Sequence, residues 1–163
     1  MDNSFVGRVN VREAGAKRGH MQMTAYLSFK GDCEAALKFY EQHLGGQLGP
    51  IFRYGGTPLA ESVPADWSDK VMHSSITIGG QVLMSGDVAP NQYESPRGFS
   101  LSLQIKQLAD AERIFHELEK GGRVLMPLEK TFWASRFGMV VDRFGIPWMI
   151  NCEESDQSIE ATA

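Results

Sequence analysis

Cysteine is scarce in this chain of 163 residues, which contains only Cys33 and Cys152. Two cysteines are too few for a disulfide scaffold, and their wide separation lacks the clustering of a zinc site. Such usage is typical of a protein in a reducing compartment. We therefore expect a cytoplasmic protein whose two thiols are ordinary ones.

Long apolar runs are absent as well, and no segment approaches the ~18 apolar residues that a membrane-spanning helix needs. Positive charge is not concentrated anywhere, because the formal net charge is −4 and no stretch is rich in lysine and arginine. Binding to phosphates of a nucleic acid needs a concentrated positive surface. We expect neither a membrane nor a nucleic acid as a partner.

What the chain does contain is an internal repeat. The segment 36–40 (ALKFY) runs into the Gly-Gly pair at 45–46, and the segment 111–115 (AERIF) runs into the pair at 121–122, at an offset of 76 residues. Both copies have the apolar period of a helix and lie between apolar runs typical of strands. The pattern predicts two copies of one small α+β module, which pack together because neither can form a good core alone. A cleft between their sheets is then a natural ligand site.

The expected elements follow the same order in both modules: a strand, a helix that a Gly-Gly pair ends, and further strands. In the first module (about 23–88) they are strands at 24–29 and 47–54, a helix at 33–44, a loop at 55–70, and a hairpin of 71–78 with 81–85. In the second module (about 97–152) they are a strand at 99–105, a helix at 108–120, and strands at 123–127, 137–141 and 148–151. We expect residues 1–22 to form an irregular extension and residues 153–163 a polar tail.

Local motifs in the second module carry a family resemblance: the segments 131–133 (TFW), 136–138 (RFG) and 142–148 (DRFGIPW), together with the two helices that end in Gly-Gly. Across residues 23–152 the chain resembles the PhnB-like branch of the vicinal oxygen chelate superfamily, which includes glyoxalase I, extradiol dioxygenases and the bleomycin-resistance proteins. The resemblance implies an α+β fold in which two βαβββ modules pair into curved sheets around a cavity. It also implies a homodimer.

Enzymes of this superfamily hold a divalent metal through His, Gln or Glu on the first and fourth strands of each module, and the metal acts as a Lewis acid. Carried onto this chain, the family's spacing gives the positions Ala25, Met84, Leu101 and Met149. A shift of one residue gives Tyr26, Ser85, Ser102 and Ile150. Neither set offers a site for a hard metal, because methionine is a soft ligand and the other side chains do not supply imidazole or carboxylate. We expect no metal site of this type and no other cofactor.

His73 is the one candidate for catalysis, as a general base near neutral pH. It lies in the strand-like segment 71–76, where its ring could face either a cavity or solvent. A histidine that is merely satisfied by its neighbours explains this position equally well. We expect His43 and His116, on the two helices, to face solvent.

Seven other side chains are expected to contact a ligand, because they combine aromatic surface with a few polar groups. They are Tyr26, Tyr54, Asp87, Trp133, Arg136, Phe137 and Trp148. Asp87 could instead be a plain turn residue. Phe137 and Trp148 could belong to the core, whereas Trp133 lies in a loop-like stretch where a core role is harder to explain.

Two functions are compatible with these residues. The first is the binding of a small, partly apolar molecule in a cavity between modules or between the chains of a dimer, without a metal. The alternative is a metal-dependent lyase, isomerase or dioxygenase whose ligands have moved, for instance to His73, Asp87 and Glu129, which would then converge within about 2.0–2.2 Å of one ion. A third possibility is a metal-free enzyme with His73 as its general base, but the sequence shows no second catalytic group to support it.

Overall fold

The computed structural model describes residues 22–153. The expected extension (1–22) and polar tail (153–163) therefore lie outside the described residues, apart from their innermost positions. Within the described part, no helix is long and apolar enough to cross a membrane. In chain order the elements are β1 (Ala25–Phe29), α1 (Cys33–Leu44), β2 (Gln47–Leu48), β3 (Phe52–Arg53), the 3-10 helices η1 (Pro58–Ser62) and η2 (Ala65–Trp67), β4 (Val71–Ile78), β5 (Gln81–Asp87), β6 (Leu101–Ile105), α2 (Leu108–Glu119), β7 (Arg123–Glu129), β8 (Arg136–Val141) and β9 (Pro147–Cys152).

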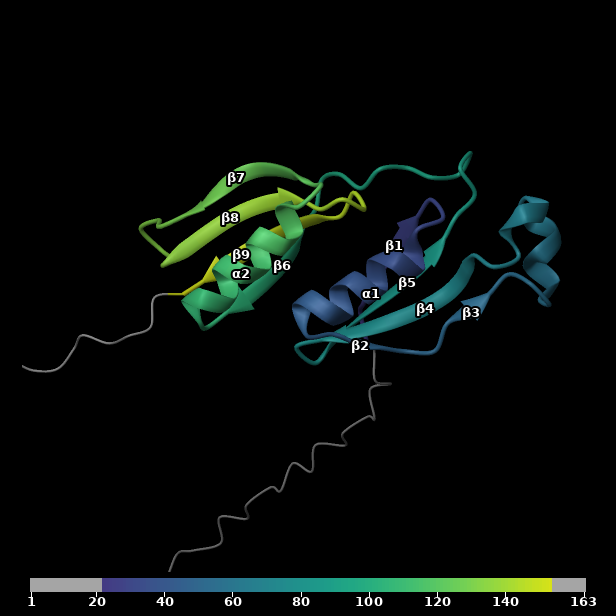
Figure 1. Cartoon of the computed structure of the whole chain (residues 1–163), viewed down its shortest axis with the longest axis horizontal. Coiled ribbons are helices and arrows are strands. Elements are labelled where there is room, and N and C mark those ends of the chain that lie inside the picture. Colours follow the sequence, from purple (N-terminus) through teal and green to yellow (C-terminus); the bar gives the residue numbers. More distant parts are fainter. Residues whose placement is uncertain (1–21, 154–163) are drawn as a thin grey trace, which may run out of the picture.

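The two modules form two separate sheets, each with its helix lying across one face (Figure 1). The first sheet has the strand order β1-β5-β4-β2, with β3 also pairing β4, and the second has the order β6-β9-β8-β7. In both sheets the first strand runs parallel to the last strand of its module, and the other pairs are antiparallel. The repeat in the sequence is thus a repeat of topology, and the predicted α+β class is confirmed.

Both helices begin and end within one residue of the predicted bounds. In α1 the buried side chains recur with helical period at Ala36, Leu37, Tyr40 and Leu44, and Gly45 ends the helix in the left-handed conformation with a φ of 68°. The buried residues of α2 are Ala111, Ile114, Phe115 and Leu118. The apolar face of each helix therefore covers the sheet of its own module.

Two stretches differ from the expectation. The strand predicted at 47–54 is interrupted between β2 and β3, where Pro50 has no N–H for the ladder. Within β3, the pairing with β4 shifts register between Phe52 and Arg53. The loop predicted at 55–70 contains the two short 3-10 helices, of which η2 buries Trp67. Pro58 at the start of η1 favours this local helical turn.

His43 does not face solvent as predicted, because it lies where the two helices meet. Its ring centroid is 4.5 Å from that of Phe39, and its Nδ1 is 3.5 Å from a carboxylate oxygen of Glu117 on α2. Arg113 of α2 also donates a hydrogen bond of 3.0 Å to the His43 carbonyl oxygen. His116 is exposed as predicted.

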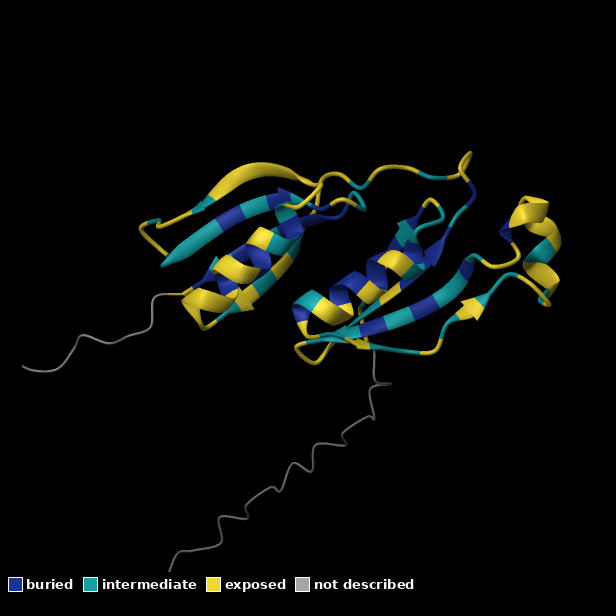
Figure 2. Cartoon of the chain, viewed as in Figure 1, coloured by how far each residue is buried: buried dark blue, intermediate teal, exposed yellow. Residues whose placement is uncertain are grey.

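Each sheet has one face covered by its helix and one open face. Successive side chains along a strand point alternately to these two faces. In the first sheet, Tyr26 and Met84 pair across β1 and β5 on the open face. In the second sheet, Trp148 is buried on the covered face, whereas the next residue, Met149, lies on the open one. Figure 2 shows exposed surface on the outer sides of both helices and along nearly all of β7.

A buried carboxylate links the two modules. Asp142, in the turn after β8, accepts hydrogen bonds at Oδ2 from the Tyr40 hydroxyl of α1 (2.6 Å) and from Trp148 Nε1 (2.8 Å). Its Oδ1 accepts the backbone N–H groups of Phe144 (2.9 Å) and Ile146 (3.0 Å). Burial, followed by the neighbouring Asp142, raises the pKa of Tyr40 well above its ordinary value, so the phenol stays protonated and donates. One side chain thus holds α1 of the first module against β9 of the second.

Replacing Asp142 by asparagine is expected to lower the free energy of unfolding by about 2–4 kcal/mol. The side-chain NH₂ group of asparagine would take the place of one carboxylate oxygen, and the buried groups that donate to this oxygen would lose their acceptor. Tyr40→Phe removes a single donor and should cost about 1–2 kcal/mol. Urea unfolding followed by circular dichroism measures both. An Asp142→Asn variant as stable as the wild type would contradict this role.

Candidate functional site

The open face of the first sheet carries a row of three rings. His73 of β4 lies between Tyr26 of β1 and Phe52 of β3, with ring centroids 5.9 Å and 6.5 Å away and interplanar angles of 26° and 27°. Tyr26 and Phe52 are 51% and 53% exposed. This ring row (Tyr26, His73, Phe52) presents partly exposed aromatic surface on which an apolar or planar group can pack.

Gly86 of β5 makes room for the Tyr26 ring. A Cβ at position 86 would lie 2.7 Å from the Tyr26 hydroxyl oxygen and 2.7 Å from the Met72 carbonyl oxygen. The Tyr26 hydroxyl points toward that same carbonyl, at 3.5 Å. Burial raises the pKa of Tyr26, so the hydroxyl is protonated at neutral pH. The ring can therefore lie across β5 only because residue 86 has no side chain.

The open face of the second sheet holds a pocket of about 500 Å³, which we call the β7–β9 pocket. Alternate residues of three neighbouring strands point to the same face and form its floor. They are Arg123 and Leu125 of β7, Met139 and Val141 of β8, and Pro147 and Met149 of β9. The linker residues 96–100 close one side. The pocket thus combines an apolar floor with very few polar groups.

Two of the predicted contact residues extend this open face beyond the pocket. Phe137 lies two residues before Met139 on β8, and Trp133 packs edge-on against it with ring centroids 5.6 Å apart. Trp133 is 52% exposed, and the adjacent Phe132 is 96% exposed. Because Arg123 lies opposite the other end of β8, the aromatic pair and the arginine lie at opposite ends of the face.

Asp87 does not offer its carboxylate to a ligand as predicted, because the backbone already uses it. The side chain is 2% exposed, and its oxygens accept the N–H groups of Gly31, Cys33 and Val71 at 2.9, 3.0 and 2.9 Å. Asp87 therefore fastens the turn between β1 and α1 to the start of β4. Tyr54 is half-buried and donates a hydrogen bond of 2.8 Å to the Asp87 carbonyl oxygen.

Two further predicted contacts face away from the open side. Arg136 forms an ion pair with Glu112 of α2 at 3.2 Å, so its guanidinium lies toward the helix. Trp148 is 1% exposed and belongs to the core. Alternation along β8 and β9 sends these side chains to the face opposite Phe137 and Met149.

The residues of the pocket floor were not found from the sequence. Met139 and Val141 continue the alternation of Phe137 along β8, and Met149 lies opposite Met139 on β9. Pairing the two predicted strands in antiparallel fashion and marking the residues on the face of Phe137 would have identified these pocket residues. Phe52 was missed because the short strand β3 depends on a shift of register that no sequence pattern shows.

Neither cysteine is a candidate nucleophile. Both are free and buried. Burial raises the pKa of the Cys33 thiol to about 12, so the reactive thiolate is scarce at neutral pH. Covalent catalysis through Cys33 is therefore not supported.

Two βαβββ modules with helix-covered sheets, and a ligand-sized hollow on an open face, define a fold of the glyoxalase type. Residues 20–150 match the family model of the Glyoxalase/Bleomycin resistance protein/Dioxygenase superfamily, and the chain belongs to this superfamily. The resemblance and the fold predicted from the motifs are confirmed.

Particular relatives are similar over nearly their whole length. Protein YjdN from Escherichia coli (strain K12) is 35% identical over 139 residues, which cover 80% of this chain and 95% of the relative. The crystal structure of protein PA1353 from Pseudomonas aeruginosa superposes with a TM-score of 0.75 at 46% identity, covering 83% of this chain and 100% of that one. The PhnB protein from Bacillus cereus gives a TM-score of 0.68 at 27% identity, covering 81% and 99%.

The registers of the sheets show which of the metal positions implied by the resemblance lie opposite each other on the open faces. Tyr26 lies opposite Met84, and Ser102 lies opposite Met149, all on the open faces. The first-strand positions are thus shifted by one residue from Ala25 and Leu101, and the fourth-strand positions are not shifted. A phenol, a hydroxyl and two thioethers do not fit a hard divalent metal.

The relocated ligands of the alternative hypothesis are not brought together either. Asp87 is buried among backbone amides of the first module, and Glu129 ends β7 in the second sheet. His73 lies in the ring row. Among residues 22–153, no group of three or more His, Cys, Asp or Glu side chains is placed to hold a metal ion.

Proposed function

We propose that this protein binds a small, partly apolar molecule on the open faces of its sheets, without the metal ion of the superfamily's enzymes. The β7–β9 pocket carries the proposal. Its volume of about 500 Å³ lies within the range of roughly 300–1,000 Å³ that is usual for small-molecule sites, and its floor is mainly apolar. The ring row and the Trp133–Phe137 pair add aromatic surface on the same open faces.

Binding is favoured over catalysis by the surroundings of His73. Its ring lies beside the rings of Tyr26 and Phe52, and within residues 22–153 the His73 side chain has no hydrogen-bond or ion-pair partner. A catalytic base is normally oriented by a further polar group and lies within reach of a second catalytic residue. His73 has neither in the described part of the chain, so we assign it to the ligand-binding surface.

We further propose that the working form is a cytoplasmic homodimer. In the described structure β1 pairs only with β5 and β6 only with β9, so each sheet has an open edge beside its open face. Open edges and exposed apolar patches favour association, and a second copy would wall the open faces into a cavity. The exposed large apolar side chains near these faces include Tyr26, Phe52, Met84, Phe99, Leu125 and Trp133. The two free, buried thiols accord with a cytoplasmic location.

Met149→Glu is expected to weaken binding of the neutral fluorescent probe N-phenyl-1-naphthylamine by about tenfold or more, because a carboxylate in the pocket floor must lose its water when the probe binds. Leu59→Glu makes the same change of charge at an exposed position of η1 outside the pocket and serves as the control. Fluorescence titration measures both affinities. Equal affinity in the wild type and Met149→Glu would show that the probe does not occupy this pocket.

Protein purified without chelator or affinity metal is expected to carry well below one equivalent of zinc, nickel, manganese or iron, because the four positions on the open faces offer no hard ligands. Added ions should leave the melting temperature unchanged. Mass spectrometry and thermal melts provide the measurements. One tightly held ion per chain would refute the proposed metal-free site.

Light scattering coupled to gel filtration should give a mass twice the 18.1 kDa of one chain. Ser102→Lys combined with Gln104→Lys places two charges on the edge strand β6 and should shift the protein toward the mass of one chain. A wild-type protein that runs at 18.1 kDa at every concentration tested would count against the dimer.

A further inference from the structure

Two guanidinium groups border the β7–β9 pocket, and no carboxylate from residues 22–153 lines it. Arg97 and Arg123 are the charged residues of its lining, and the rest is apolar except for Gly98 and Ser100. A pocket in a chain of net charge −4 thus carries local positive charge over an apolar floor. This combination matches a molecule with an anionic end and an apolar body.

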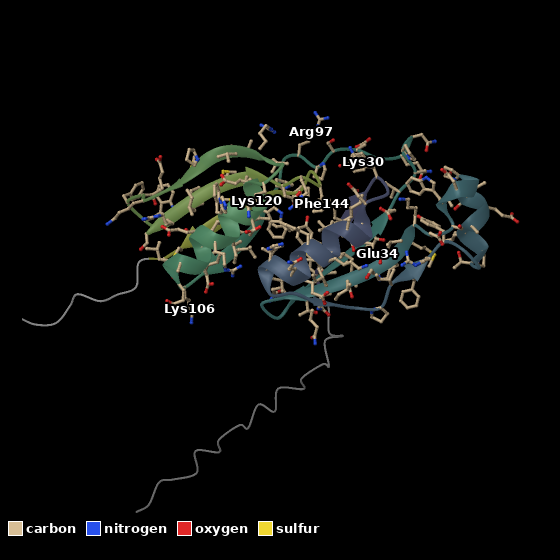
Figure 3. The ribbon with its side chains drawn as sticks, viewed as in Figure 1. Lys30, Glu34, Arg97, Lys106, Lys120 and Phe144 are labelled. Carbon is tan, nitrogen blue, oxygen red and sulfur yellow. The ribbon has the colours of Figure 1, made fainter. Side chains whose placement is uncertain are left out.

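Arg123 belongs to the floor by its place in the strand. It lies on the same face of the sheet as Leu125 and opposite Val141, at the end of β8 that is far from Phe137. Arg97 comes from the linker, and Figure 3 shows its side chain extending outward at the end of the second sheet. Arg123 therefore contributes charge inside the pocket, and Arg97 contributes it at the rim.

Three other arginines of this protein pair their guanidinium groups with carboxylates. Arg53 pairs with Glu34 at 2.9 Å, Arg113 with Asp110 at 3.2 Å and Arg136 with Glu112 at 3.2 Å. Within residues 22–153, the guanidinium group of neither pocket arginine has a hydrogen-bond or ion-pair partner. Glu94 shares a neighbouring hollow with Arg97 but does not line the β7–β9 pocket.

We propose that the β7–β9 pocket selects a small organic anion, whose carboxylate, phosphate or sulfonate group is held by Arg123 and Arg97. The inference rests on the proposed binding function and adds the charge of the ligand. The apolar body of the ligand lies over Met139 and Met149. Val141 lies four positions after Phe137 on β8, and at about 3.3 Å per position a body of up to about 13 Å reaches from the arginine end to the aromatic end.

The test compares two fluorescent probes that share one aromatic skeleton. The sulfonate 8-anilinonaphthalene-1-sulfonate is anionic, and N-phenyl-1-naphthylamine is neutral. Arg123→Gln is expected to weaken binding of the sulfonate by about tenfold and binding of the neutral probe far less, because only the sulfonate makes a charge-assisted contact with the guanidinium. Arg123→Lys, which keeps the charge, should recover most of the affinity, and Arg97→Gln should give a smaller loss. Raising the salt concentration should weaken binding of the sulfonate probe and leave binding of the neutral probe unchanged.

Lys106→Gln is the matched control, since it makes the same change of net charge at a side chain that Figure 3 shows at the distant end of the second sheet. It should leave both affinities unchanged, and melting curves confirm that each variant is folded. An unchanged ratio of the two affinities in Arg123→Gln, or failure of the sulfonate to bind, overturns the inference. The proposed binding function survives either of these results if the neutral probe binds the wild type and Met149→Glu abolishes this binding. If Met149→Glu changes the affinity of neither probe, the proposed binding function fails together with the inference.

Discussion

The arrangement of the whole molecule depends on the buried carboxylate of Asp142. Its two oxygens accept four hydrogen bonds, two from side chains that belong to different modules and two from the backbone of its own turn. The rings of Tyr40 and Trp148 meet edge-to-face at 5.3 Å above it. Because this contact fixes α1 of the first module against β9 of the second, the covered faces of both sheets share one core. The open faces of the two sheets take no part in this core.

The division between covered and open faces explains why residues of the proposed binding surface and residues of the core are close neighbours in sequence. Asp87 follows Gly86, and Trp148 precedes Met149. In each pair one residue serves the core and the other serves the open face, since successive side chains of a strand point to opposite sides. The β7–β9 pocket is therefore a property of strand pairing, because its lining residues come from three strands and a linker.

This alternation also decides how much the sequence could predict. The helices were predicted closely because their apolar spacing, seen at Leu37, Tyr40 and Leu44, repeats over several turns and ends at glycine. Arg136 and Phe137 were both assigned to the site, although adjacent residues of a strand cannot both face it, and an error of one residue exchanges the two faces. Asp87 could not be assigned correctly, because its role depends on three backbone amides that only the tertiary fold brings together.

The open faces are rich in sulfur. Met84, Met139 and Met149 lie at or next to their centres, where a flexible and polarisable thioether can adjust to ligands of different outline. The same thioether is converted by oxidants into a polar sulfoxide, which would place an oxygen dipole on an apolar surface. The thioethers that would let the proposed site adapt to a ligand therefore also make these faces sensitive to oxidants.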